Sequence, residues 1–397
     1  MTGALPSPLE GIRVLDLSRL LPGPFCSLIL ADLGAEVIKV EEPGFGDYIR
    51  WVPPLYHGKS YRYLILNRNK ESITLDLKSE EGREIFLKLV SKSDVVLESF
   101  RPGVAKRLGI SYDHLKTENP GIIYCAISGY GQDGPYSNLS GHDIDYIGYG
   151  GILGITGEKD KPPTIPGVQI ADIGGGGMLA ATSILAALMA RTKTGRGQFV
   201  DVSMLDGVVS WLSIHAAEYF GGGKSPERGK MMLSGGLAAY NIYETSDGKY
   251  LTLGILEEWF WKNLCSALGR DDLCKINFMN PSEQPSLFLF LKEAFRKKPL
   301  SEWIKILNAA DVPCGPVNSI EDVFKDKQVL HREMLLEISD PVIGTIRKIG
   351  TPIKLSETPV TYRNAPPELG QHTEELLMKL VGLSKGKIMA LKKARII

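Results

Sequence analysis

The first 130 residues alternate short apolar runs with longer amphipathic ones. Residues 80–93 place Ile85, Phe86, Leu89 and Val90 on one side of a helix, which is the spacing of a helix packed on a core. An earlier helix begins in the Pro-rich turn at residues 21–24 and ends at Gly34. The apolar runs between such segments are short, which favours buried strands, and we expect these at residues 13–20, 35–43, 72–77, 94–100 and 121–131.

This alternation predicts an α/β fold, in which a parallel sheet carries helices on both faces. Ligands of such folds bind beyond the carboxyl ends of the strands. Here those ends carry loops rich in Gly and Pro, with the sequences SRLLPGP, EEPGFGD, ESFRPG and SGYGQDGP. Any one of them is an ordinary tight turn, but four at equivalent positions favour a shared binding rim.

The rest of the chain predicts a second, smaller domain. Residues 174–191 favour a helix, and residues 197–220 a strand followed by a helix. A loose polar stretch then precedes a hairpin at residues 242–255, with its turn at Asp247–Gly248. Helical segments follow to about residue 328, and the chain ends in a basic helix. We therefore expect a large domain at residues 1–224, a smaller one at 225–328, and a C-terminal segment at 329–397 that returns to the large domain.

Composition narrows the function. Lys plus Arg and Asp plus Glu both number 46, and a neutral chain without basic blocks argues against nucleic acid as the main partner. The N-terminus lacks the pattern of a signal peptide, and the apolar run at residues 178–190 is too short to cross a bilayer. The five cysteines form no CxxC pair. These features predict a reduced, cytoplasmic enzyme that needs no membrane and no structural zinc.

One aspartate followed by four glycines, at residues 172–177, raises the question of a phosphate-binding loop. A Walker A loop requires a lysine after its last glycine, and a dinucleotide loop requires an acidic residue about 20 positions later; both are missing. A second reading is that the glycines clear space beside Asp172 and expose backbone N–H groups to a ligand. A plain helix N-cap is the alternative. Because four glycines weaken a helix, we favour a functional Asp172.

Residue patterns alone leave several other candidates open. His142 follows the Gly-rich loop SGYGQDGP, which puts it near the expected rim, although a lone histidine is usually structural. Glu257 stands where a strand gives way to a helix, so a solvated helix-start glutamate is the simpler interpretation. Four basic residues could contact phosphate, although surface charge is the default for each: Lys39, Arg68, Arg101 and Arg107.

Taken together, the motifs resemble family III CoA-transferases, the CaiB/BaiF family, and within it the α-methylacyl-CoA racemase branch. The resemblance runs from Gly11 to the C-terminal helix and rests on an ordered set of motifs: RVLDLSRLLPGP, LGAEVIKVEEPGFGD, NRNKESITLDLK, SFRPGVAKRLG, SGYGQDGP, TGRGQFVDVSM and DVPCGPV. It implies a Rossmann-like large domain, a smaller α+β domain, and an interlocked homodimer.

The resemblance also implies roles for three residues. In the transferases the aspartate that matches Asp172 is a nucleophile that attacks an acyl-CoA thioester. In the racemases it is an acid/base opposite a histidine that is paired with a glutamate, and the matching motifs here supply His142 and Glu257. The glycine-run loop of many transferases is reduced here to Gly235–Gly236. We therefore expect a 2-methylacyl-CoA racemase, with a CoA-transferase and a non-catalytic CoA-binding protein as alternatives.

Coenzyme A is expected as part of the substrate, without a prosthetic group or metal. The position after Val40–Glu41 is often arginine in relatives, but here it is Glu42, which leaves the adenine end of the site to be explained. Met231 and Met232 are candidates for the acyl pocket or for the core. Positions that the resemblance assigns to CoA contact are Leu20, Leu75, Ser99, Phe100 and Arg107, and Lys39, Arg101 and Tyr130 are further candidates on the same loops.

Overall fold

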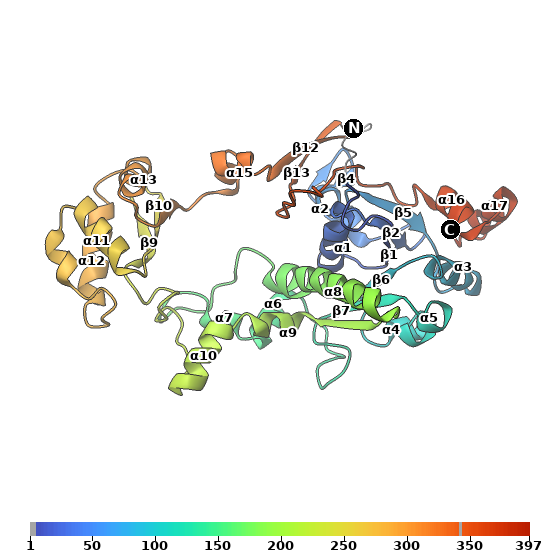
Figure 1. The fold of residues 1–397 in the computed structure, drawn as a ribbon, viewed down its shortest axis with the longest axis horizontal. Helices are drawn as coiled ribbons and strands as arrows, with labels where there is room; N and C mark the ends of the chain where they lie inside the picture. Colours follow the sequence, from blue (N-terminus) through green and yellow to red (C-terminus); the bar gives the residue numbers. More distant parts are fainter. Residues whose placement is uncertain (1–4, 341–343) are drawn as a thin grey trace. The chain divides into compact units, whose positions relative to one another are not determined.

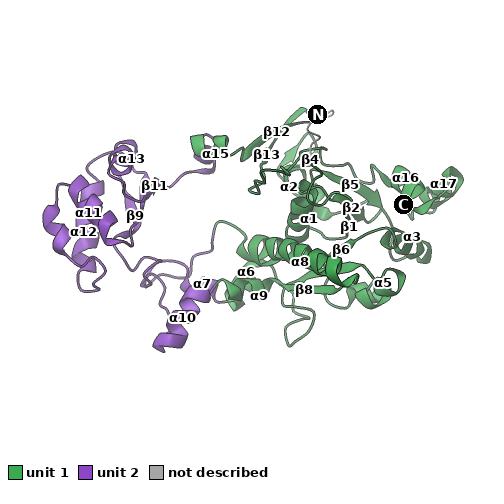
Figure 2. Cartoon of the chain, viewed as in Figure 1, with its two compact units in different colours: residues 1–150, 167–211, 327–397 green, residues 151–166, 212–326 purple. Residues whose placement is uncertain are grey.

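The structure, a computed structural model, describes residues 5–340 and 344–397 and divides into two compact units (Figure 2). Unit 1 comprises residues 1–150, 167–211 and 327–397, and unit 2 comprises residues 151–166 and 212–326. The expected boundary between residues 224 and 225 differs from this division. Residues 151–166 and helix α10 (Ser213–Gly222) belong to unit 2, although the sequence analysis assigned them to the large domain.

Unit 1 is built on a six-stranded sheet in which every neighbouring pair is parallel (Figure 1). Its strand order is β5-β2-β1-β6-β7-β8. Counted along the chain, this is the order 3-2-1-4-5-6 of a doubly wound Rossmann-like sheet. The expected α/β fold class is therefore confirmed. The strands are β1 (Arg13–Asp16), β2 (Glu36–Glu41), β5 (Lys70–Thr74), β6 (Val95–Glu98), β7 (Ile123–Ser128) and β8 (Phe199–Ser203).

Helices cover both faces of this sheet because successive strand residues point to opposite sides. Leu15, Ile38 and Val96 pack with the apolar side of α3 (Glu80–Val90), whose first turn is capped by Ser79. The other face carries α1 (Pro22–Asp32), which begins with prolines in its first turn, and α8 (Leu179–Thr194). Shorter elements of unit 1 are η1 (Tyr48–Trp51), β3 (Leu55–Tyr56), β4 (Lys59–Ser60), α2 (Tyr61–Leu66), α4 (Val104–Arg107), α5 (Tyr112–Glu118), α6 (Asp143–Tyr149) and α9 (Met204–Ser210).

The glycine run lies in a π-helical segment, η2 (Ile170–Met178), which continues directly into α8. Together they form a helix of 25 residues that is apolar and long enough to cross a membrane by length and composition. The apolar helix is therefore longer than the run expected at residues 178–190, because the glycines before that run are helical as well. Half of its most apolar window is buried, and η2 packs against α1 and α9. Because core helices pass the same test, we assign it to the core of unit 1.

The C-terminal residues are fastened to the β5 edge of unit 1. The backbone N–H of Asn69 donates to the carbonyl of Asn364, and that of His372 donates to Ser72. Arg363 donates to the carbonyls of Ala31, Gly34 and Ala35 at the end of α1. The segment contains α15 (Lys327–His331), β12 (Leu335–Asp340), β13 (Gly344–Ile349), α16 (Thr373–Leu376), η4 (Leu377–Val381) and α17 (Lys385–Lys393).

Unit 2 has an antiparallel three-stranded sheet of order β11-β10-β9. The turn of its hairpin falls at Asp247–Gly248 as expected, and Gly248 has a φ of 73°, which favours glycine. Trp261, Phe295 and Trp303 anchor its core. Its elements are α7 (Ile152–Ile155), β9 (Tyr240–Glu244), β10 (Tyr250–Gly254), α11 (Glu258–Ala267), η3 (Asp271–Lys275), α12 (Gln284–Phe295), α13 (Leu300–Ala309), β11 (Cys314–Pro316) and α14 (Ile320–Val323), besides α10.

Candidate active site

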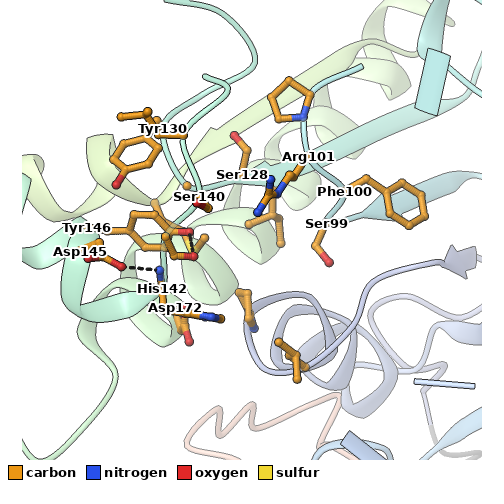
Figure 3. A pocket seen from close by; sticks show the side chains of 18 of the residues that line it. Ser99, Phe100, Arg101, Ser128, Tyr130, Ser140, His142, Asp145, Tyr146 and Asp172 are labelled. Carbon is orange, nitrogen blue, oxygen red and sulfur yellow. Dashed lines mark hydrogen bonds between the residues drawn. The ribbon is translucent and has the colours of Figure 1, made fainter. Parts of the chain in front are cut away.

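A cavity of about 730 Å³ opens in unit 1 beyond the carboxyl ends of β1, β6 and β7 (Figure 3). β1 and β6 are the strands between which the chain order of the sheet reverses, and doubly wound folds bind their ligands at this point. Three of the four loops of the expected rim, SRLLPGP, ESFRPG and SGYGQDGP, line this cavity, whereas EEPGFGD does not. The cavity brings together seven of the predicted site residues, namely Leu20, Ser99, Phe100, Arg101, Tyr130, His142 and Asp172.

Asp172 enters the cavity from the first turn of η2 and is half-buried. Burial raises the pKa of its carboxyl group to about 6, the nearby Asp143 carboxylate adds to the rise, and His142 opposes it. The backbone N–H groups of Ala171 and Asp172 both donate to Oδ1 of Asp143, at 2.7 and 3.0 Å. A carboxyl group with a pKa near neutrality exchanges protons more readily than a solvated one.

His142 immediately precedes α6 and is exposed. Its backbone N–H donates to Oδ2 of Asp145 at 2.9 Å, which satisfies a donor at the start of that helix. Figure 3 shows His142, Asp145, Tyr146 and Asp172 together on one side of the cavity, with Arg101 among the side chains across from them. His142 and Asp172 thus reach the same space from two separate segments of the chain.

Tyr146 forms the wall behind these two residues. Its hydroxyl donates to the carbonyl of Gly141 at 2.5 Å, and burial, followed by the charge of Asp172, raises its pKa to about 12. A Cβ atom at Gly129 or Gly141 would lie 2.4 or 2.8 Å from the Tyr146 ring. Tyr130 packs edge-on against that ring, with centroids 5.1 Å apart. The glycines of these loops therefore allow the aromatic wall to pack closely.

The four glycines after Asp172 are required by helix packing. A Cβ atom at Gly174 would lie 2.1 Å from the Trp211 ring, and one at Gly175 would lie 2.8 Å from the carbonyl oxygen of Met204. Gly176 and Gly177 are similarly close to α1, where Pro22 lies. All four glycines are buried. The expectation that they clear space for a ligand is therefore wrong, since α1, α9 and Trp211 occupy that space. The N–H groups just before the glycines, those of Ala171 and Asp172, donate to Asp143.

Leu20 is held at the cavity in a strained conformation. Its φ is 63°, in the left-handed region that disfavours a leucine, and its N–H donates to Oδ1 of Asp47 at 3.2 Å. Lys39 is fully buried, with its Nζ 3.0 Å from Oδ2 of Asp47 and 2.8 Å from the carbonyl of Ser18. Lys39 does not line the cavity, so the predicted phosphate contact is wrong. It supports the loop that carries Leu20.

A second cavity of about 260 Å³ adjoins the first, because Arg19 and Phe100 line both. Leu75 lines it as well, and the CoA contact that the resemblance implies for it stays a prediction. Glu42 is also at its edge, where its Oε1 lies 2.9 Å from Nζ of Lys78. The negative charge of Glu42 is therefore balanced by Lys78, which sequence reasoning did not consider.

Other predicted residues lie elsewhere. Arg107 is exposed in α4 and is outside the residues that line these two cavities. Arg68 is buried in an ion pair with Asp32, which excludes a phosphate contact. Glu257 belongs to unit 2, where it directly precedes α11, so its pairing with His142 stays a prediction. In unit 2, Met231 is buried and Met232 is exposed.

Sequence reasoning missed several residues of the larger cavity. Arg19 lies in the loop SRLLPGP, three residues beyond the end of β1. Because the strand order reverses beside β1, the position of Arg19 in this loop could have indicated that it lines the site. Tyr146 stands four residues after His142, one helical turn along α6. Tyr48 and Met204 also line the cavity. Tyr48 directly follows the loop EEPGFGD, and Met204 is the last residue of the motif TGRGQFVDVSM, so both were within reach of the sequence.

Comparison with known proteins agrees with this fold. The sequence model of CoA-transferase family III matches residues 9–373. The mouse succinyl-CoA:glutarate CoA-transferase is 37% identical over 387 residues, which is 96% of this chain and 88% of that protein. Human alpha-methylacyl-CoA racemase is 33% identical over 390 residues, 98% of this chain and 97% of that protein. A solved CaiB/BaiF family protein from Brucella suis is 34% identical, with a TM-score of 0.83, and the match covers 95% of this chain and all of that one.

The chain therefore belongs to CoA-transferase family III, and the family resemblance read from its motifs is confirmed. It is an enzyme of this family, whose members here include both transferases and racemases.

Proposed function

We propose that the protein interconverts the R and S forms of a 2-methylacyl-CoA by moving the proton on C2. The observation that carries this proposal is that Asp172 and His142, a carboxyl group and an imidazole that can each donate or accept a proton, line one cavity. The pKa of about 6 for Asp172 supports it, because such a carboxyl group can act both as base and as acid. The GHDIDY motif around His142 resembles the racemase branch rather than the transferases.

In the proposed reaction one of the two groups removes the α-proton, and the electron pair of the C–H bond moves into an enolate of the thioester. The other group then delivers a proton to the opposite face of the same carbon. No atom is gained or lost and no electrons leave the substrate, so the chemistry requires neither a redox cofactor nor a metal. The coenzyme A part of the substrate would extend past Phe100 into the smaller cavity, with Arg19 and Lys78 as the nearest cations.

Two parts of the proposal concern the assembled enzyme. Glu257 would orient His142 and stabilise its protonated form, as the family resemblance implies, so Glu257→Gln should lower kcat more than it raises KM.

The functional form would be an interlocked homodimer. In α10, Ile214 is 60% and Phe220 is 81% exposed, and such apolar side chains are typical of surfaces that a partner covers. Analytical ultracentrifugation should find a dimer that persists at nanomolar concentration.

A CoA-transferase is the second candidate, favoured by the 37% identity to a succinyl-CoA:glutarate CoA-transferase. In that reaction the Asp172 carboxylate would attack the thioester carbon and expel the CoA thiolate, which leaves a mixed anhydride. The thiolate would then attack the aspartyl carbon and release the donor acid. An acceptor carboxylate would finally take the CoA through the reverse steps, which regenerates Asp172.

One assay separates the two reactions. Enantiopure 2-methylacyl-CoA is incubated with the enzyme in D₂O, with and without a panel of free acids, and α-deuterium and configuration are followed by NMR. We expect exchange and loss of optical purity without any acid. Transfer of CoA that requires an acid, together with a hydroxylamine-sensitive adduct on Asp172 and no α-exchange, would establish the transferase instead. A series of acyl groups of graded length then defines the acyl specificity.

A further inference from the structure

Asp143 is joined to the segment of Asp172 by two hydrogen bonds. One oxygen of its carboxylate, Oδ1, accepts the N–H of Ala171 at 2.7 Å and the N–H of Asp172 at 3.0 Å. Ala171 and Asp172 follow Asp143 by 28 and 29 residues, so both hydrogen bonds are tertiary contacts. In α6 it is Asp145, three residues beyond His142, that accepts the N–H of His142, which leaves the Asp143 carboxylate for η2.

We propose that Asp143 is a positioning residue for the reaction: its carboxylate fixes the first turn of η2, and thereby the direction in which Asp172 enters the cavity, and its negative charge acts on the carboxyl group of Asp172. The proposal rests on the proposed function, in which Asp172 exchanges the substrate proton.

The start of η2 lacks the usual means of support. Its N-cap residue is Gln169, which makes no side-chain cap hydrogen bond, while the first N–H groups of any helix need acceptors from outside the helix. Four glycines follow Asp172, and glycine restrains the backbone least of all residues. The glycines pack against α1 and α9, whereas the two N–H groups at the end that carries Asp172 have Asp143 as their acceptor. Without this carboxylate, the backbone N–H groups of Ala171 and Asp172 would lose their acceptor.

The negative charge of Asp143 also affects the protonation of Asp172. After burial, it is the second cause that raises the Asp172 pKa, and His142 is the group that lowers it. Tyr146 also interacts with Asp172, but its own pKa of about 12 keeps it neutral. The elements packed against η2 carry few other charges: Asp145 on α6, Asp32 on α1, Arg191 and Lys193 on α8, Asp201 on β8 and Asp206 on α9. Of these, Asp32 is bound to Arg68 and Arg191 to Asp94.

The test uses two substitutions that separate geometry from charge. Asp143→Asn keeps a side-chain oxygen that can accept both N–H groups but removes the charge, so kcat should stay within about threefold while the acidic limb of its pH profile moves down by about one unit. Asp143→Ala removes the acceptor, and kcat should fall by about 10- to 100-fold with KM within about threefold. Asp113→Asn, on the surface of α5, is the matched control and should leave both quantities unchanged. Wild-type kcat in Asp143→Ala, or an unmoved pH profile in Asp143→Asn, would overturn the proposal.

A measurement without turnover keeps this result distinct from failure of the proposed function. In protein labelled with ¹³C at the aspartate carboxyls, the signal absent from Asp172→Asn reports the titration of Asp172. It should titrate near pH 6 in the wild type, lower in Asp143→Asn, and near pH 6 in Asp113→Asn. If Asp143→Asn leaves this titration unmoved, the proposal is wrong even for an active racemase. If the titration moves while the wild type racemises no substrate, the proposed function is wrong and the role of Asp143 in setting Asp172 stands.

Discussion

The carboxyl group of Asp172 shares a cavity with the imidazole of His142, and His142 is the neighbour that lowers the pKa of this carboxyl group while burial raises it to about 6. Because Asp172 must be ionised to accept a proton, kcat/KM for the enantiomer whose proton faces it should fall tenfold per pH unit below about pH 6. A pH profile between 4.5 and 8 measures this. An acidic limb centred near pH 4, the ordinary value for an aspartate, would contradict the assignment.

The raised pKa also predicts a more stable inactive variant. Unfolded Asp172 has the ordinary pKa of 3.8, so between about pH 4 and pH 6 the folded protein binds more protons than the unfolded one. Stability therefore falls as the pH rises through this window, by at most about 3 kcal/mol. Asp172→Asn cannot ionise. At pH 7.5 its free energy of unfolding, measured with urea, should therefore exceed that of the wild type by about 1–3 kcal/mol, with a higher urea midpoint. The two proteins should become equally stable near pH 4. An equal or lower midpoint at pH 7.5 would show that the site does not penalise the charge.

Lys39 should matter for folding rather than for CoA affinity. Its ion pair with Asp47 is buried on both sides, so Lys39→Met leaves a buried carboxylate without its cation, which costs about 3–5 kcal/mol. Urea unfolding measures the loss. Lys78→Met, in the exposed pair with Glu42, is the matched control and should cost less than about 1 kcal/mol. If Lys39→Met were as stable as the control and only KM for acyl-CoA rose, Lys39 would be a ligand contact after all.

The glycine run predicts a packing defect on substitution. In Gly175→Ala the new Cβ would lie 2.8 Å from the carbonyl oxygen of Met204, which is backbone and cannot rotate away. Overpacking of this kind costs about 1–3 kcal/mol, and the shift of η2 should lower kcat as well. Gly154→Ala in α7 has open space around it and should be neutral or slightly stabilising. Equal thermal midpoints for the two variants would contradict this reading of the run.

Much of the fold was predictable because it follows local patterns. The helix expected at residues 80–93 is α3, which ends at Val90, since the spacing of its apolar residues reports the buried side directly. Three of the four Gly- and Pro-rich loops at the strand ends, SRLLPGP, ESFRPG and SGYGQDGP, likewise line the cavity. The boundary between the units was not predictable in this way, because residues 151–166 join unit 2 through tertiary contacts.

The errors at the site share one physical cause, which is that a partner distant in sequence decides a side chain's role. Lys39 looked free, but Asp47 pairs with it inside the protein; a lysine within an apolar central strand was a sign of burial that the sequence did offer. The glycines looked like a ligand loop, but α9, about 30 residues later, requires them. Asp143 received no role from the sequence, although its carboxylate accepts the N–H groups of Ala171 and Asp172.

The most direct test of two proton carriers in one cavity is α-proton exchange by single variants, measured in D₂O on each pure enantiomer of a 2-methylacyl-CoA. Asp172→Asn should exchange the α-proton of one enantiomer only, His142→Ala that of the other only, and both should lose racemisation by about 10³-fold or more. The unchanged elution volume of each variant on size exclusion serves as the folding control. Racemisation that survives in either variant, or loss of exchange from both enantiomers in each, would contradict the two-carrier mechanism.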